Sequence, residues 1–230
     1  MSMRRIRAVL HKQVKDTLKN KSVLIQFLFF PIITIILQNS ISLKDMPENF
    51  FVTLFGTMYA GMAPLVAVAG IIAEEKEKNT LRVLRMANVG AGEYLIGIGF
   101  YVVVLCLLGV FVIGLQGTYD AGGVGLFVLY LGFGVIITAL LGAFIGVCSR
   151  NQMSATAISV PVMCVLAFLP MLSIFNEKIA KVSQFVYTQQ VYDLVSGSMK
   201  ISTRSLVIVL ANAAVVLVLF IVGMRRRGLD

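Results

Sequence analysis

Six long apolar runs alternate with shorter polar segments along the chain. They cover residues 22–38, 51–72, 95–115, 124–147, 157–175 and 205–224, and none holds an Asp, Glu, Lys, Arg or His. A helix needs roughly 20 mostly apolar residues to cross a bilayer, because the hydrocarbon core is about 30 Å thick. The pattern therefore predicts an all-α integral membrane protein with six transmembrane helices, in one transmembrane domain over residues 1–230.

The composition agrees with this pattern. Of 230 residues, 58% are hydrophobic and 13% are charged, and the mean hydropathy is +0.91. A soluble globular domain has about a quarter of its residues charged. Buried core helices of a soluble protein are therefore excluded as an explanation of the six runs.

The positive charges are distributed unevenly between the loops. If the N-terminus is cytoplasmic, the inside segments hold 15 of the Lys and Arg residues and the outside segments hold 5. Cytoplasmic loops of membrane proteins carry such an excess. This distribution predicts a protein of the cell membrane with both termini on the cytoplasmic side. The net charge of +9 therefore indicates contact with anionic lipid and not a nucleic-acid partner.

Residues 1–21 alternate between apolar and basic positions at helical spacing. The apolar positions are Ile6, Val9, Leu10, Val14 and Leu18, and Lys and Arg fill most of the others. This pattern is typical of an amphipathic interfacial helix on the inner leaflet. Membrane lipid is the partner that it predicts.

Residues 73–94 form the most polar segment between two predicted spans. Asn79 or Thr80 can cap a short helix, which would carry Leu81, Leu84 and Arg85 along one edge. We expect a short cytoplasmic helix parallel to the membrane. Residues 176–204 hold a second set of helically spaced apolar positions, which predicts one or two short helices at the outer leaflet or re-entering it.

The spans at 95–115 and 124–147 are rich in glycine. Gly142 and Gly146 form a Gly-x-x-x-Gly step. Small residues allow helix backbones to approach closely in lipid. We expect this step to serve packing within the chain rather than dimerisation.

The chain lacks the residue patterns of several kinds of site. A phosphate-binding loop needs a Gly-Lys pair, and none occurs. No predicted span holds the ionisable acid that proton or sodium coupling usually needs, and one His with three unclustered Cys offers no metal motif. We expect no catalytic, cofactor or metal site, so energy for transport would come from another chain.

One segment resembles a known family. Permease subunits of ABC-2-type exporters carry Glu-Glu-Lys-Glu-x-Gly-Thr-Leu-x-x-Leu after their second span, and residues 74–84 read Glu-Glu-Lys-Glu-Lys-Asn-Thr-Leu-Arg-Val-Leu. Asn151 to Ala157, followed by Pro161, resembles the family's entry to span five. The chain departs from the family pattern at Asn79 for glycine, Asn88 for proline and Ile98 for lysine.

The resemblance implies two permeases, identical or related, bound to two ABC ATPase subunits that hold ATP and Mg. It implies a bacterial or archaeal cell membrane and a coupling helix near residues 79–88. The implied ATPase-coupling residues are Glu74, Glu75, Glu77, Asn79, Thr80, Leu81, Leu84 and Arg85. The implied substrate path between the permeases is lined by Gln26, Phe30, Thr34, Met58, Met62 and Met163.

The apolar interior favours export of a hydrophobic or amphipathic substrate, such as a drug, an antimicrobial peptide or a lipid-like molecule. A permease for glycans or lipid-linked molecules of the same family remains an alternative, and so does a passive channel or scaffold without an ATPase. On the coupling-helix hypothesis, Leu84→Asp would abolish partner binding and leave membrane insertion intact.

Overall fold

The computed structural model describes residues 3–19, 21–40, 47–197 and 202–227. Within these residues the chain forms ten helices and no strand. Their bounds are α1 Met3–Lys19, α2 Lys21–Ser40, α3 Phe50–Glu77, α4 Thr80–Met86, α5 Ala91–Gly114, α6 Ala121–Cys148, α7 Gln152–Phe175, α8 Glu177–Ser183, α9 Tyr187–Ser196 and α10 Thr203–Arg227. The all-helical fold class is confirmed.

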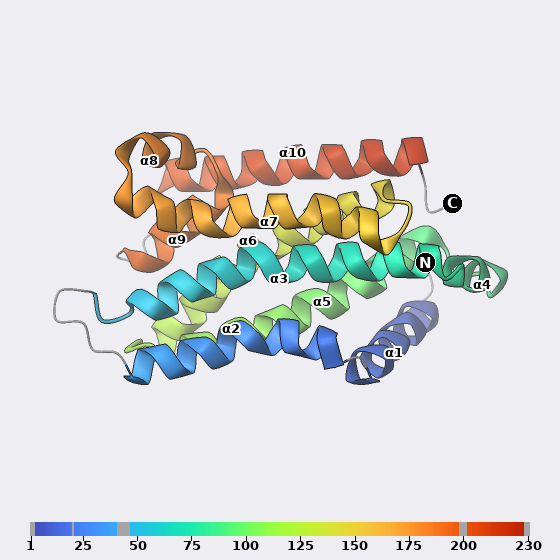
Figure 1. Cartoon of the computed structure of the whole chain (residues 1–230), viewed down its shortest axis with the longest axis horizontal. Helices are drawn as coiled ribbons and strands as arrows, with labels where there is room; N and C mark the ends of the chain where they lie inside the picture. Colours follow the sequence, from blue (N-terminus) through green and yellow to red (C-terminus); the bar gives the residue numbers. More distant parts are fainter. Residues whose placement is uncertain (1–2, 20, 41–46, 198–201, 228–230) are drawn as a thin grey trace.

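The six longest helices lie side by side along one axis (Figure 1). They are α2, α3, α5, α6, α7 and α10. The short helices gather at the two ends of this bundle: α1 and α4 at one end, α8 and α9 at the other. The last turns of α10 lie at the same end of the bundle as α1 (Figure 1).

Five helices are long and apolar enough to cross a membrane: α3, α5, α6, α7 and α10. The chain is therefore a multi-pass membrane protein. A sixth crossing would come from α2, whose described residues 24–40 form a pair with α1 that is bent by 69°. The count of six stays a prediction, although α2 runs alongside the five others (Figure 1).

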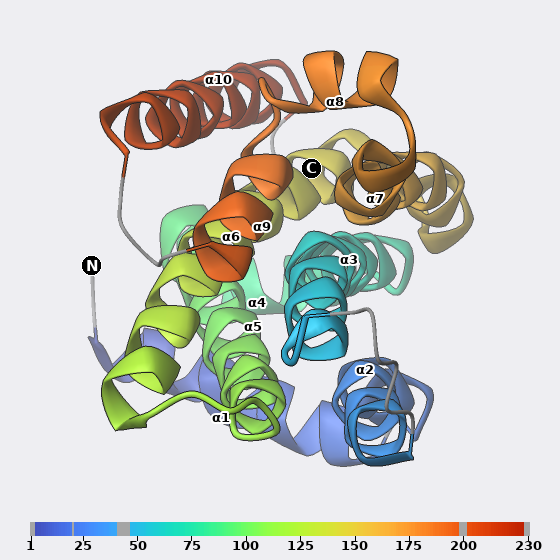
Figure 2. The ribbon, with the colours of Figure 1, turned by 90° about the vertical axis from the view of Figure 1, so that its left-hand side faces the viewer.

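The helix α3 is the centre of the bundle. Viewed along the bundle axis, α2, α5, α6 and α7 surround it (Figure 2). In its most apolar stretch 72% of the residues are buried, compared with 17% in α10 at the edge. The side chains of Tyr59, Leu65 and Ile72 are fully enclosed along its length.

The helices α3 and α6 meet at the predicted Gly-x-x-x-Gly step. A Cβ atom on Gly142 would lie 2.5 Å from the carbonyl oxygen of Leu65, and one on Gly146 would lie 2.9 Å from Cβ of Ile72. Real side chains essentially never come this close to a neighbour. Both glycines therefore serve contact within the chain, as the sequence predicts.

The helix α9 is buried inside the bundle. Its Tyr187 hydroxyl lies 2.6 Å from Oγ1 of Thr138 on α6, and Val191 packs where Gly134 of α6 leaves room. Within residues 176–204, where one or two short helices are expected, the described part holds α8 and α9. Because Tyr187, Thr188, Gln189 and Gln190 are all buried, α9 enters the bundle while α8 stays at its rim.

The helix α1 crosses the ends of α3 and α5. One side of it is buried through Val9, Gln13 and Thr17, at intervals of four residues. Val9 fits against Gly97 of α5, where a Cβ atom would lie 2.8 Å from Cγ1 of Val9. The exposed apolar side carries Met3, Val14 and Leu18.

We expect Gly142→Ala to destabilise the bundle, because the new methyl group would meet the backbone of α3. Overpacking of this kind costs about 1–3 kcal/mol. Thermal unfolding in detergent measures the effect. Gly125→Ala in the same helix is the control, since nothing lies within 4 Å of its Cβ position. A Gly142→Ala protein as stable as Gly125→Ala would contradict the close contact.

Candidate functional site

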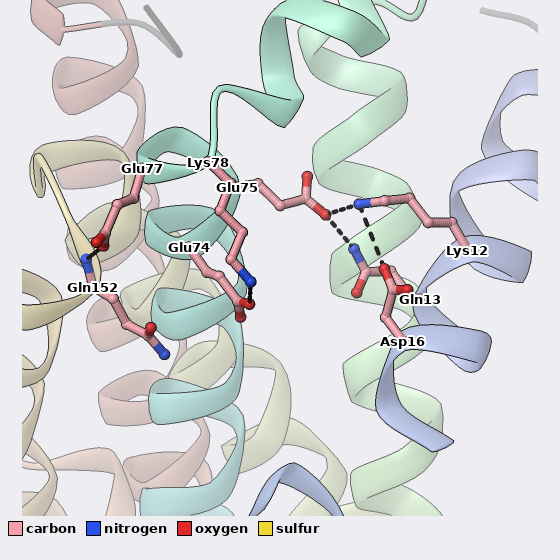
Figure 3. Close-up of polar contacts among 8 residues, drawn as sticks. All are labelled: Lys12, Gln13, Asp16, Glu74, Glu75, Glu77, Lys78 and Gln152. Atoms are coloured by element: carbon pink, nitrogen blue, oxygen red, sulfur yellow. Dashed lines mark hydrogen bonds and ion pairs between the residues drawn. The ribbon is translucent and has the colours of Figure 1, made fainter. Parts of the chain in front are cut away.

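The last turn of α3 carries four consecutive charged residues, Glu74, Glu75, Lys76 and Glu77. We call these four residues the α3 charged turn. Successive residues of an α-helix point about 100° apart, because 3.6 residues make one turn. Since α3 is surrounded, the four side chains meet different neighbours, as Figure 3 shows for its three glutamates.

Glu75 points toward α1. It is 6% exposed, and its Oε1 accepts hydrogen bonds from Nζ of Lys12 and from Nε2 of Gln13, the latter at 2.7 Å. Lys12 also lies 3.7 Å from Asp16 of α1 (Figure 3). A buried carboxylate is costly unless it is paired and hydrogen-bonded. The helix α1 supplies partners for Oε1 of Glu75, whereas Oε2 is buried without a hydrogen bond among the described residues.

Glu77 and Lys76 point toward the junction of α6 and α7. The backbone N–H of Gln152 donates to Oε2 of Glu77 at 2.9 Å (Figure 3). Lys76 donates through Nζ to the carbonyl of Val147 at 2.8 Å. The negative Glu77 at the N-terminus of α7 and the positive Lys76 at the C-terminus of α6 both interact favourably with the helix dipoles.

Glu74 pairs with Lys78 on the surface of the same helix. This contact raises the pKa of the Lys78 ammonium, with the hydrogen bond to Glu74 as the largest cause. The Lys78 ammonium therefore stays charged at neutral pH. An exposed pair of this kind contributes little to stability.

A second buried carboxylate fixes α1 to α5. Glu93 is 5% exposed, accepts from the backbone N–H of Gly90 at 3.1 Å and lies 3.6 Å from Nη1 of Arg5. Two basic residues of α1, Arg5 and Lys12, thus bind carboxylates of the bundle. The amphipathic pattern placed the basic residues of α1 at the lipid surface. Gln13 and Thr17, which follow Val9 at intervals of four residues, indicate instead that this side of the helix contacts polar groups of the bundle.

The helix α4 follows two residues after the α3 charged turn. Asn79 and Asn88 flank it with positive φ values of 55° and 57°. The N–H of Val89 donates to the carbonyl of Leu84 at 3.0 Å, a bond that commonly closes a helix before a left-handed residue. Glycine and asparagine are the residues that adopt this conformation most readily, and proline cannot. Both departures from the family pattern thus fit the backbone.

The apolar residues of α4 divide between the core and the surface. Leu81 is 7% exposed and Leu84 is half-buried, and both pack on the core of this chain. Leu81 is thus covered within the chain and Leu84 is partly exposed beside it, while their assignment to partner coupling stays a prediction. Val83 and Met86 are exposed instead, at 59% and 78%.

The other predicted coupling residues differ in accessibility. Glu75 is buried and hydrogen-bonded to α1, so within this chain its side chain is not accessible to a partner, and its role in coupling stays a prediction. Glu77 and Asn79 are exposed, and Glu74 and Thr80 are half-buried. The side chain of Arg85 lies outside the described residues.

The predicted substrate-path residues are packed within the chain. Phe30, Thr34 and Met58 are buried, and the Thr34 hydroxyl donates to the carbonyl of Phe30 at 2.7 Å. Gln26 donates to the carbonyl of Ala63 at 3.4 Å. Met62 and Met163 are half-buried against the two apolar clusters of the bundle. Gln26 and Phe30 of α2 thus contact α3. Met163 lies on α7 and packs against the second apolar cluster.

Across the part of the chain that the structure describes, no three His, Cys, Asp or Glu residues gather closely enough to hold a metal ion. The candidate site is therefore an arrangement of ion pairs and helix ends, formed by α1, α3, α4 and the α6–α7 junction. No protein family matches this chain in a comparison with known families, and no curated protein matches it significantly.

We expect Glu75→Gln to loosen α1 from the bundle. The neutral amide loses its charge-assisted bond to Lys12, and a lost bond at a buried site costs about 1–3 kcal/mol. Hydrogen exchange of the α1 backbone measures the release. Glu74→Gln is the matched control, because its pair with Lys78 is exposed. Equal exchange in the two variants would refute the role of Glu75.

The backbone at Asn79 predicts a second effect. A β-branched residue in the left-handed region costs about 1–2 kcal/mol, so Asn79→Val should lower the melting temperature. Asn79→Gly should leave it unchanged or raise it, because glycine adopts positive φ freely. Thermal unfolding of both variants in the same detergent decides the question, and identical melting temperatures would exclude the positive φ.

Proposed function

We propose that this chain is the membrane permease subunit of an ATP-driven exporter whose ATPase is a separate subunit. The observation that carries the proposal is α4, a seven-residue helix at one end of the bundle with two apolar side chains exposed. Helices with spaced apolar anchors dock into grooves of partner proteins. The side chains available for docking are Val83 and Met86.

The connection of α4 to the bundle suits a motor-driven movement. Only two residues separate α4 from the α3 charged turn. Through Glu75, Lys76 and Glu77 that turn binds α1, the end of α6 and the start of α7. A force on α4 would therefore act on four helices together, which is what a rigid-body change of the bundle requires.

In this proposal α1 lies on the inner leaflet. Met3, Val14 and Leu18 would face acyl chains, while α1's buried side holds the bundle. The bend of 69° to the described part of α2 supports this placement, because it turns α1 away from the spans. The basic residues of α1 without an ion-pair partner among the described residues would face anionic headgroups.

The proposed substrate is hydrophobic or amphipathic, and its path lies between two permeases, identical or related. The exposed face of α2 supports this class, since a shallow groove of about 360 Å³ on it is lined entirely by apolar side chains. They are Ile25, Leu28, Phe29, Ile32, Ile33 and Ile36. Glycans would need polar partners that this face does not offer.

We expect Met86→Asp to prevent an ATPase subunit from co-purifying with the chain and to abolish transport. The new charge would be placed in an apolar contact, while the fold should remain intact because Met86 is 78% exposed. Affinity purification from native membranes, followed by identification of stoichiometric partners, measures the effect.

Met153→Asp is the matched control, because Met153 is 82% exposed on α7. Leu84→Asp should instead lower thermal stability, since Leu84 packs on the core. Retention of the ATPase by Met86→Asp would reject α4 as its docking element. A wild-type chain that purifies alone would reject the proposed function.

A further inference from the structure

A polar cleft of about 580 Å³ lies between α1 and the last turns of α3. Figure 3 shows all of its charged side chains except Lys19; they come from α1, from the last turn of α3 and, for Lys78, from the residue that follows α3. Its lining consists of Lys12, Gln13, Asp16, Thr17, Lys19, Ile71, Glu74, Glu75, Lys78 and Thr80. All but Ile71 are polar, in a chain that is 58% hydrophobic.

Three of the polar lining residues are buried. Gln13, Thr17 and Glu75 are 3%, 5% and 6% exposed. The amide of Gln13 donates to Oε1 of Glu75 at 2.7 Å. The cleft therefore has one fixed wall, and its charged rim is carried by side chains with more freedom.

The cleft has three ammonium groups and three carboxylates. Lys12 pairs with Glu75 and Asp16, and Lys78 pairs with Glu74. Among the described residues Lys19 has no ion-pair partner. The formal charge of the lining is zero. The Lys19 ammonium is nevertheless available to an anionic group, and the oxygens of Asp16 and Glu74 can accept further hydrogen bonds.

We propose that this cleft binds the phosphoethanolamine headgroup of a membrane phospholipid. The phosphate would bind the Lys19 ammonium, and the ligand's ammonium would bind the carboxylates of Asp16 and Glu74. The volume suits such a group, because small-molecule sites occupy roughly 300–1,000 Å³. The bound headgroup would bridge α1 and α3.

Charge balance selects a zwitterion. An anionic headgroup would lie among three carboxylates, and a purely cationic ligand among three ammonium groups. Either would add an uncompensated charge to a neutral, partly buried lining, which is unfavourable. A zwitterion offers both partners at once and leaves the lining neutral.

The position of the cleft indicates a lipid as the source of the headgroup. Met3, Val14 and Leu18 on the exposed side of α1 suit the boundary between acyl chains and headgroups. The cleft is lined by the buried side of the same helix, through Gln13 and Thr17. This inference depends on the membrane placement of α1 and not on an ATPase partner.

The test is lipid retention by the purified full chain. The protein is incubated in mild detergent with equal amounts of phosphatidylethanolamine, phosphatidylglycerol and phosphatidylcholine of the same acyl chains. Native mass spectrometry then counts the bound lipids. We expect at least fivefold more bound phosphatidylethanolamine than either competitor, because choline has no N–H donors and phosphatidylglycerol has no cation.

Lys19→Ala should remove most of this selectivity. Lys15→Ala is the matched control: it has the same charge change on the same helix, and Lys15 is exposed outside the cleft. Asp16→Asn is a second variant, which should weaken binding of phosphatidylethanolamine and leave phosphatidylglycerol unchanged. Thermal unfolding checks that all three variants are folded.

Three results would overturn the proposal: equal retention of the three lipids by the wild type, preference for phosphatidylglycerol, or identical selectivity in Lys19→Ala and Lys15→Ala. Soluble glycerophosphoethanolamine distinguishes the source. If only the soluble compound raises the melting temperature and no lipid is selected, a membrane lipid is rejected as the ligand.

Discussion

A charge at the edge of a bilayer must reach water or a partner, and α3 arrives there surrounded by other helices. Its four terminal charges cannot all turn to solvent. Glu75 is enclosed by α1, while Lys76 and Glu77 bind the ends of α6 and α7. The hydrogen bonds of Glu75, Lys76 and Glu77 therefore determine how the helices pack at this end of the bundle. They position α1 across the bundle and fix the end of α3, after which α4 begins.

The apolar part of α3 imposes a second constraint. Without a hydrophobic driving force between helices in lipid, close contact must supply the attraction. Gly142 and Gly146 let α6 approach the α3 backbone, and Gly97 does the same for α1 on α5. The centre of the bundle is thus built from contacts that permit little movement, which leaves movement to the helix ends and to whole-helix displacement.

The two ends of the bundle differ in how they use polar groups. At the α4 end, charged residues form pairs across helices, and a cleft between α1 and α3 remains open. At the opposite end, α9 brings uncharged polar side chains inside, and Tyr187 binds Thr138 of α6. Charge pairs can exchange partners with an incoming ligand or subunit, whereas the buried hydroxyl pair fixes α9 in place. The docking and lipid proposals both fall at the charged end for this reason.

The sequence by itself determined the helices, because the length of an apolar run and its flanking charges decide whether a segment can cross a bilayer. It also predicted a helix within residues 1–21, a short helix after the second span, and the Gly142–Gly146 contact. Only the tertiary structure decided which side of each helix is covered. Leu81 is buried and Leu84 partly so, Val83 and Met86 are exposed, and Glu75 of α3 is bonded to α1. Local spacing cannot reveal these choices, since they depend on neighbours that are distant in the sequence and on how α1 folds back across the bundle.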